Sequence, residues 1–552
     1  MKLRSALERA GAAREPSEHE IPPLYFALIV AALAIGLFAR LSGLALESLW
    51  LDEAYGVYWA RQPVLDILTE PQADAKLFTL LQKVALFVVG DSDFTVRLVP
   101  LVASLLTTVF VYRAARVVGG DSAWAAAALY LVYPIGINFS RIGRAYSVLL
   151  LAASAFLWLS LRFLGQPRRD TFGWALGAWV MVLYSHKSGY FLGPLLIALI
   201  ALRPEFIRAE AGFVSRHLIL GTLACVPLVM MEISAMTVSQ ATYANAASLA
   251  PKISAWLYPF YSIYNLTPQT LFAERGVFEM MGIGQPWTAL AHVLYLVPLG
   301  LGVAALWAKR GEAGRNCGLL FLILWAFTPQ LFMTLLTFAG MPVYIAGRND
   351  LALLLPMVLL PACGLALIRV EKVRALLIAL ILLTLAPYHL AVVSGVRPTF
   401  RGLDRANALR VSRAMGPRDG CIFIGHIYFS YERYFDATRL PQCITLGVGA
   451  VLNSKAAPEA RMETFLKAHM ARGARIWIMA PQDAFTRGND LDVARKAVND
   501  AAQAAGLQAE ERAQDVAFDW QGKAMILRLS LEEKTPAISD GTTPLLPRPA
   551  SQ

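Results

Sequence analysis

The residues best suited to chemistry are two adjacent carboxylates, Asp52 and Glu53, which follow the first long apolar run of the chain. That run covers residues 25–46, and the pair lies between Trp50 and Tyr55. Acidic side chains are costly where a membrane helix reaches the bilayer surface unless they have partners or a task. The stretch therefore has two interpretations, a reactive carboxylate pair or an aromatic interfacial anchor with a solvated acidic cap.

The composition is that of a polytopic α-helical membrane protein. Of the 552 residues, 57% are hydrophobic and 16% are charged, and the mean hydropathy is +0.51. A soluble protein of this composition would expose too much apolar surface, and several apolar runs are long enough to cross about 30 Å of hydrocarbon. The net charge of +11 fits basic cytoplasmic loops better than a nucleic-acid partner.

About eleven apolar runs are predicted to span the membrane, and basic residues gather in alternate connections between them. If residues 53–95 stay on the outer surface, every basic connection faces the cytoplasm, as the positive-inside rule requires. If residues 76–90 were counted as a span, all of the basic connections would instead face the outside. The amino terminus, with residues 1–23 as a tail, is then cytoplasmic. The runs are 24–45, 97–112, 122–138, 145–163, 172–185, 188–202, 217–235, 287–307, 317–338, 350–368 and 373–394.

Two segments between the first two spans are predicted to lie on the membrane surface. Residues 56–69 and 76–90 have apolar side chains at helical spacing but are too short or too polar to span. They belong to an outer loop, 48–96. A second long outer loop, 236–286, is rich in aromatic residues, which fits an interfacial belt or a clamp for a lipid or sugar ring.

The outward-facing span ends also collect basic side chains. Arg141 and Arg144 follow the third run, His186 and Lys187 lie in the next outer loop, and Arg348 precedes the tenth run. Such cations could bind an anionic substrate. A Lys or Arg at a span end could equally extend to lipid headgroups, and His186 could hydrogen-bond within its own loop, so both interpretations stay open.

The chain changes character after the last span. Between residues 396 and 533, strand-length apolar runs alternate with helical patterns, which predicts a small extracytoplasmic α/β domain. The tail 534–552 is rich in Pro, Thr and Ser, which is typical of disorder. The five cysteines show no metal-binding spacing. A disulfide between Cys421 and Cys443 is left open by the sequence.

Six segments, in order over about residues 20–395, resemble the GT-C superfamily of membrane glycosyltransferases. This superfamily includes the protein O-mannosyltransferases and the lipid A aminoarabinose transferases, of glycosyltransferase families 39 and 83. The segments are Ser48-Leu-Trp-Leu-Asp-Glu-Ala-Tyr, Gly90-Asp-Ser-Asp-Phe-Thr-Val-Arg-Leu-Val-Pro, Tyr112-Arg-Ala-Ala-Arg, Tyr133-Pro-Ile-Gly-Ile-Asn-Phe-Ser-Arg-Ile-Gly-Arg-Ala-Tyr-Ser, Tyr184-Ser-His-Lys and Ala346-Gly-Arg-Asn-Asp-Leu-Ala-Leu-Leu-Leu-Pro.

The resemblance implies a GT-C catalytic domain over residues 24–395 that transfers a sugar from a polyprenyl-phosphate carrier. The acceptor would be a lipid, glycan or protein on the outer face of a bacterial-type inner membrane. By its position in the motif, Asp52 would be the base that an acceptor hydroxyl needs. Glu53 would bind the acceptor, or help to hold a divalent metal if one is used. Tyr55 and Tyr146 are further candidates for substrate binding, although packing also explains Tyr146.

The leaving group of this reaction would be a lipid phosphate, which needs cations to take up its developing charge. Arg144, Lys187 and Arg348 are the candidates, with His186 as a hydrogen-bond donor. Arg141 would bind substrate or lipid phosphate. Direct displacement by the acceptor would invert the anomeric centre.

Two other classes of function remain possible on the sequence. A transporter or flippase of a lipid-linked sugar would carry ionisable residues within its spans and inverted repeats, whereas here the ionisable residues collect at outer span ends. A non-catalytic scaffold for envelope assembly would tolerate the change Asp52→Asn.

Overall fold

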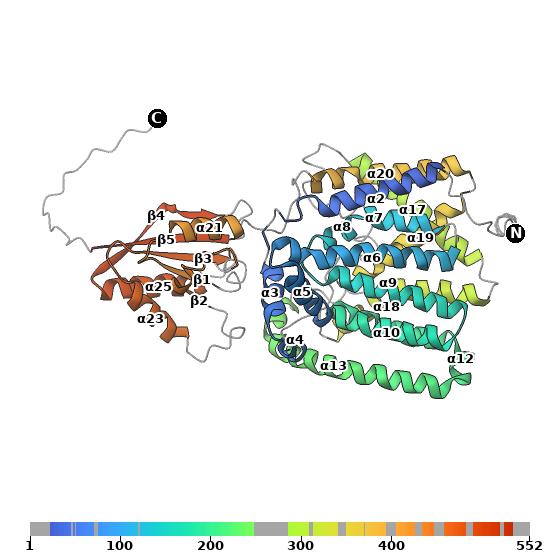
Figure 1. Ribbon diagram of the computed structural model, residues 1–552, viewed down its shortest axis with the longest axis horizontal. Helices are drawn as coiled ribbons and strands as arrows, with labels where there is room; N and C mark the ends of the chain where they lie inside the picture. Colours follow the sequence, from blue (N-terminus) through green and yellow to red (C-terminus); the bar gives the residue numbers. More distant parts are fainter. Residues whose placement is uncertain are drawn as a thin grey trace. The chain divides into compact units, whose positions relative to one another are not determined.

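The computed structural model of the chain divides into two compact units (Figure 1). The helical unit comprises Met1–Glu47 and Tyr55–Thr399, and the α/β unit comprises Ser48–Ala54 and Phe400–Gln552. The structure describes residues 23–45, 48–49, 51–70, 75–119, 122–247, 285–308, 313–339, 349–368, 370–393, 404–424, 433–446, 458–481, 489–518 and 524–533.

The helical unit places a helix, or a pair of helices, on each of the eleven predicted apolar runs. Among the described residues, four helices are long and apolar enough to cross a membrane, or five if the bent pair α7/α8 is one span. The count of eleven spans therefore stays a prediction. The elements are α2 Pro23–Leu41, α3 Leu51–Arg61, α4 Val64–Thr69, α5 Lys76–Val89, α6 Asp93–Gly119, α7 Ala123–Val132, α8 Pro134–Ser140, α9 Tyr146–Gly165, α10 Arg169–Ser185, η2 Lys187–Leu192, α11 Gly193–Ala201, α12 Pro204–Ala209, α13 Ala211–Ala247, α17 Gln285–Ala308, α18 Ala313–Phe338, η4 Leu351–Leu353, α19 Leu354–Ala366 and α20 Glu371–Val393.

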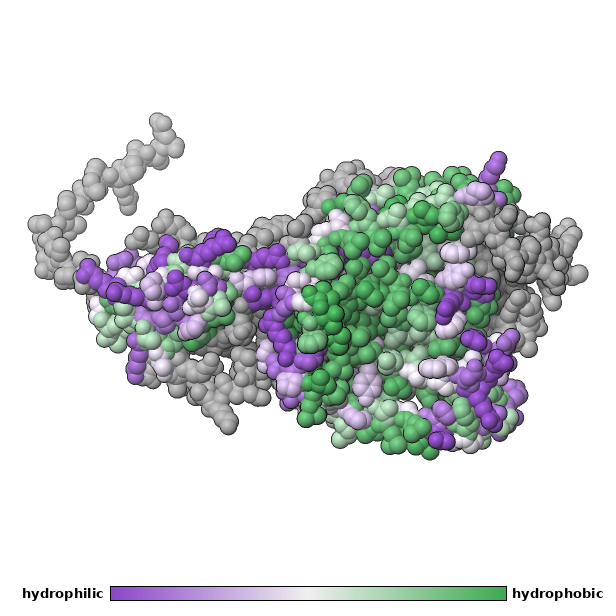
Figure 2. All heavy atoms as spheres, viewed as in Figure 1, coloured by the Kyte–Doolittle hydropathy of each residue, from purple (hydrophilic) through white to green (hydrophobic). Residues whose placement is uncertain are grey.

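The surface of the helical unit carries a broad apolar band. Figure 2 shows this band across the middle of the bundle, with hydrophilic residues towards both ends of the helices. Exposed apolar side chains line it, for example Val102, Leu106 and Val109 on α6 and Leu223 and Met230 on α13. A soluble monomer does not expose apolar surface on this scale, whereas lipid covers it without cost.

The third predicted span is two helices rather than one. Pro134 follows Tyr133, and α7 and α8 meet there at 59°, because proline lacks the N–H that would continue the helical hydrogen bonds. Side chains from other helices bind the carbonyls at the end of α7. Arg40 Nη1 donates to Leu131 O, and His389 Nε2 donates to Val132 O at 3.1 Å. The carbonyls that the bend leaves without helical partners therefore receive hydrogen bonds from side chains within the bundle.

The predicted surface segments form three helices, since Pro63 separates α3 from α4. Helix α5 has an inverted amphipathic pattern: Lys76, Thr79 and Gln82 are buried, whereas Phe87 is 89% exposed and Val88 is 71% exposed. An outward apolar face of this kind is typical of a helix that lies at a membrane interface.

One side chain of α5 also fixes the end of α3. Lys83 Nζ donates to the carbonyls of Gln62, at 2.7 Å, and Ala60, at 3.3 Å. Both carbonyls lie at the carboxyl end of α3, where the last helical carbonyls lack partners within the helix. A cation at this end is also favoured by the helix dipole.

The α/β unit contains a five-stranded mixed sheet with the order β2-β1-β3-β5-β4. Strand β1 pairs in parallel with β2 and β3, while β5 pairs antiparallel with β3 and β4. The strands are β1 Gly420–Ile424, β2 Cys443–Leu446, β3 Arg475–Pro481, β4 Leu507–Phe518 and β5 Ala524–Glu533, and the helices are α21 Asp404–Ala414, η5 Leu440–Gln442, α23 Pro458–His469 and α25 Asn489–Ala504.

Strand β1 is buried on both faces of this sheet. Ile422 and Ile424 pack into one hydrophobic cluster, and Cys421 and Phe423 pack into another on the opposite face. Cys421 lies in register with Cys443 on β2, and both are free thiols in the structure. Burial and the neighbouring Cys443 thiol raise the pKa of Cys421.

Helices α17 and α19 pack with their backbones in contact. A Cβ added at Gly302 would overlap the carbonyl oxygen of Leu360, and one added at Gly364 would overlap that of Pro298. Small residues at such crossings allow close approach between membrane helices.

We predict that Gly302→Ala lowers the free energy of unfolding by about 2 kcal/mol, because the methyl group forces the two helices apart. Thermal unfolding of the purified protein in detergent would measure this. Gly300→Ala is the matched control, since no atom lies within 4 Å of its added Cβ. Equal melting temperatures for the two variants would contradict the prediction.

Candidate active site

Helix α3 presents the predicted catalytic residue in its first turn. Asp52 and Glu53 lie in that turn, Glu53 fully buried and Asp52 partly exposed. Negative side chains are favoured at a helix amino terminus by the helix dipole. Asp52, Tyr55, Gly56 and Trp59 are spaced i, i+3, i+4 and i+7, so they lie along one face of the helix.

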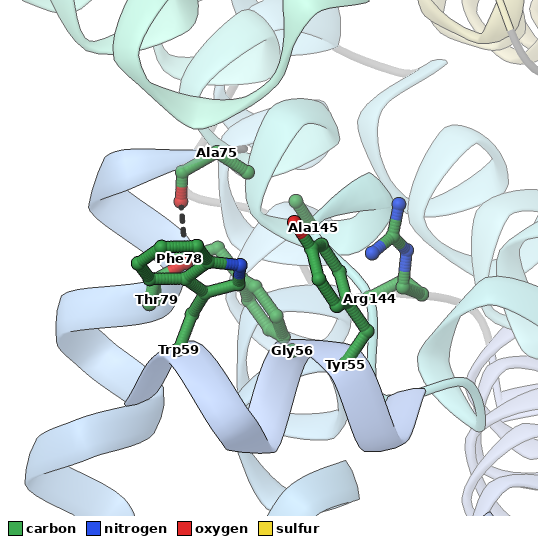
Figure 3. Close-up of a pocket in the computed structure, with 8 residues that line it drawn as sticks. All are labelled: Tyr55, Gly56, Trp59, Ala75, Phe78, Thr79, Arg144 and Ala145. Carbon is green, nitrogen blue, oxygen red and sulfur yellow. Dashed lines mark hydrogen bonds between the residues drawn. The ribbon is translucent and has the colours of Figure 1, made fainter. Parts of the chain in front are cut away.

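The same face of α3 lines a pocket in the helical unit (Figure 3). Tyr55 rises from α3 between Trp59 and Arg144, and the Tyr55 and Trp59 rings meet edge to face with centroids 6.2 Å apart. The pocket contains about 280 Å³ of empty space, including its open mouth. Its lining residues are Tyr55, Gly56, Trp59, Ala75, Phe78, Thr79, Arg144 and Ala145.

Most of this lining was not predicted from the sequence. Tyr55 and Arg144 were predicted as substrate-binding residues, whereas Gly56, Trp59 and Phe78 were not. The helical spacing from Asp52 could have indicated Gly56 and Trp59. Phe78 could not be found in this way, because its placement depends on how α5 packs against α3.

The turn that carries Arg144 leads into a chain of contacts between distant segments. Tyr146 begins α9 directly after this turn, and its buried ring packs against the His186 ring at a centroid distance of 5.0 Å. His186 Nδ1 accepts a hydrogen bond from the Ser188 N–H at 3.1 Å. Ser188 Oγ donates to Asn349 Oδ1 at 2.9 Å. The structure therefore brings together three of the predicted loops at one end of the bundle.

The remaining predicted residues have different positions. Lys187 begins η2 and is partly exposed, next to His186. Arg348 lies outside the residues that the structure describes, directly before Asn349 in the sequence. The loop 236–286 also lies largely outside the described residues.

Arg141 has backbone partners in the structure. Its guanidinium is buried, and Nη1 donates to the carbonyls of Ala39, at 2.7 Å, and Ser42. Arg97 Nη1 similarly donates to Leu44 O at 2.7 Å. These carbonyls lie at and just beyond the end of α2, where helical carbonyls need partners from elsewhere. These hydrogen bonds show that Arg141 stabilises the end of α2. The sequence pattern had grouped it with Arg144 as a candidate for substrate binding.

The described residues contain no group of three or more His, Cys, Asp and Glu side chains that could hold a metal ion. Glu53 was the one predicted metal ligand, and within these ranges it has no such cluster around it.

Comparison with known proteins finds one family model that matches part of the chain and several solved structures with a similar fold. The family model described as dolichyl-phosphate-mannose-protein mannosyltransferase matches residues 75–233, which is less than a third of the chain. No curated protein matches the chain by sequence. The crystal structure of ArnT from Cupriavidus metallidurans in the apo state is 12% identical with a TM-score of 0.50, over 91% of this chain and 97% of ArnT.

Two further structures align less closely. ArnT from Cupriavidus metallidurans bound to undecaprenyl phosphate is 13% identical with a TM-score of 0.43, over 92% of this chain and 98% of that one. The archaeal oligosaccharyltransferase AglB from Archaeoglobus fulgidus, in complex with an inhibitory peptide and a dolichol-phosphate, is 12% identical with a TM-score of 0.47. That alignment covers 94% of this chain and 75% of AglB.

The chain therefore shares its fold with apo ArnT. Residues 75–233 are in addition similar to the mannosyltransferase family model, and both findings support the resemblance to the GT-C superfamily that the sequence predicts.

We predict that Arg141→Gln lowers the free energy of unfolding by about 3 kcal/mol, because it removes charge-assisted hydrogen bonds to buried carbonyls. Thermal unfolding in detergent would detect the change. Arg144→Gln is the matched control, since Arg144 is partly exposed and lies three residues further along. If the two variants unfolded at the same temperature, Arg141 would not hold the end of α2.

Proposed function

We propose that the protein transfers a sugar from a polyprenyl-phosphate carrier to an envelope acceptor, with Asp52 as the general base. The observation that carries this proposal is the face of α3 on which Asp52 precedes Tyr55, Gly56 and Trp59, because these three residues line the pocket with Arg144. The matched family, whose description names a dolichyl-phosphate-mannose donor, supports a lipid-phosphate donor here.

The proposed base acts on the acceptor. A hydroxyl is a poor nucleophile because its own pKa lies far above neutrality, so a positioned carboxylate must take its proton as it attacks. The acceptor oxygen forms a bond to the anomeric carbon while the bond from that carbon to the phosphate oxygen breaks. The electron pair leaves with the lipid phosphate, and the anomeric centre is inverted. Glu53, buried beside Asp52 in the same turn, would orient the acceptor.

The proposed cations act on the leaving group. Arg144 lines the pocket and can clamp phosphate oxygens through two parallel hydrogen bonds, while Lys187 would act as a point charge. His186 and Arg348 are further candidates for the same phosphate. Preorganised donors of this kind stabilise the charge that develops in the transition state.

We also place this site on the outer face of a bacterial-type inner membrane. The distribution of basic loops supports this orientation, with the amino terminus cytoplasmic and the α/β unit extracytoplasmic. The acceptor would then be a lipid, a glycan or a protein of the envelope.

Buried ionisable residues in the bundle are the feature that a transporter would need. Arg40 and His389 are of this kind, but both bind backbone carbonyls around the α7/α8 bend. This use as backbone partners favours the glycosyltransferase over the transporter.

We predict that Asp52→Asn lowers the turnover number at least a hundredfold, because the amide cannot accept the acceptor's proton. Purified protein would be assayed for sugar transfer with a panel of polyprenyl-phosphate sugars. Asp66→Asn on α4 is the control, since it makes the same change in a neighbouring helix. Equal turnover by the wild type and the Asp52→Asn variant would exclude Asp52 as the base.

We predict that Arg144→Lys retains binding of the lipid phosphate but lowers the turnover number about tenfold, because an ammonium cannot form the two-pronged contact with phosphate oxygens. Arg144→Gln should weaken the binding of the lipid phosphate and also lower the turnover number. Steady-state kinetics with the active donor would separate the two effects. Wild-type kinetics in both variants would remove Arg144 from the site.

A further inference from the structure

The start of α3 belongs to the α/β unit, although the rest of the helix belongs to the helical unit. The compact units divide within α3, with Ser48–Ala54 on one side and Tyr55 on the other. The first helical turn, which carries Asp52 and Glu53, is therefore grouped with the residues that follow Phe400.

Within the α/β unit, a hydrogen bond between Leu49 and Tyr434 connects the segment Ser48–Ala54 to the residues after Phe400. The Leu49 N–H donates to Tyr434 Oη at 2.7 Å, and Leu49 is fully buried. Leu49 lies two residues before α3 begins and three before Asp52. A bond at this point restricts the backbone as it enters the helix, where first turns otherwise fray.

Tyr434 is itself held in place by the core of the α/β unit. Its neighbour Phe435 is buried against Phe423 of β1, with ring centroids 5.5 Å apart at 82°. The Arg405 guanidinium of α21 lies 5.2 Å from the centre of the Tyr434 ring, which is within the range of a cation–π interaction.

The residues after Tyr434 form a closed turn. Asp436 accepts hydrogen bonds from the Thr438 N–H, at 2.9 Å, and from Thr438 Oγ1, at 2.8 Å. These bonds lower the pKa of Asp436. The Tyr434 hydroxyl therefore projects from a segment that is held by the buried Phe435 and by the turn at Asp436 that follow it.

We infer that Tyr434 is a positioning residue for Asp52, so that the α/β unit holds the start of the catalytic helix. This inference rests on the proposed function. Lys83 of α5 fixes the other end of α3 through Ala60 and Gln62, and Tyr434 completes the restraint at the beginning. The pocket residues lie beyond the first turn, so losing the Tyr434 hydroxyl should disturb the base and leave donor binding intact.

The test is the variant Tyr434→Phe in the full-length protein, which keeps the ring and its contact with Arg405. The expected result is a turnover number about tenfold lower with an unchanged KM for the polyprenyl-phosphate donor. Hydrogen–deuterium exchange of peptides covering residues 48–54 should become about fivefold to tenfold faster, because the Leu49 amide loses its partner. Tyr112→Phe is the matched control, since Tyr112 packs its ring on Trp124 at 4.6 Å far along α6.

The two measurements separate this inference from the proposed function. Unchanged exchange in peptides 48–54, or faster exchange with wild-type turnover, would overturn the positioning role even if the enzyme transfers sugar. A rise in donor KM without a fall in turnover would also overturn it, because the effect would then lie in the pocket. If the wild type transferred no sugar, the proposed function and the catalytic part of the inference would fail together, while exchange would still report whether Tyr434 holds the segment.

Discussion

The architecture depends on giving every backbone carbonyl inside the helical unit a hydrogen-bond partner. Water cannot supply partners within a bilayer, so an interrupted helix must be completed by side chains from its neighbours. Here α2 ends beside Arg141 and Arg97, and α7 is interrupted beside Arg40 and His389. These bonds join α2, α6, α7, α8 and α20, and they fix the turn that carries Arg144 at one end of the bundle.

This constraint separates two kinds of buried or half-buried cation. Arg40, Arg97 and Arg141 are fully buried, and the hydrogen bonds described above go largely to backbone carbonyls. Arg144 instead lines a pocket and is partly exposed. A guanidinium that must satisfy carbonyls cannot be given up to a substrate without exposing those carbonyls, whereas one that lines a pocket can exchange its partners as a substrate arrives.

The positions of the helices could be predicted from the sequence better than the roles of individual side chains. Apolar runs located the helices, because they follow from local composition, whereas the orientation that the positive-inside rule predicts stays a prediction. Composition could not tell Arg141 from Arg144, since both are arginines at the end of the same run and differ only in what packs beside them. The α7/α8 bend was signalled by Pro134, but whether a proline bends or ends a helix depends on partners such as His389, more than 250 residues away. The grouping of Ser48–Ala54 with the α/β unit likewise includes a contact with Tyr434, which is 385 residues from Leu49, and no local pattern encodes such a contact.

The division of α3 between two units has a consequence for catalysis. A helix transmits a restraint along its axis only as far as its hydrogen bonds are intact, and its first turn has the fewest. The proposed base, Asp52, lies in that turn, whereas Tyr55, Gly56 and Trp59 lie in the turns that follow. A loosened start of α3 would therefore move Asp52 while the pocket kept its shape. Since a small misplacement of a catalytic group is costly in rate, a contact at the start of α3 can, under the proposed function, affect turnover without touching the residues that line the pocket.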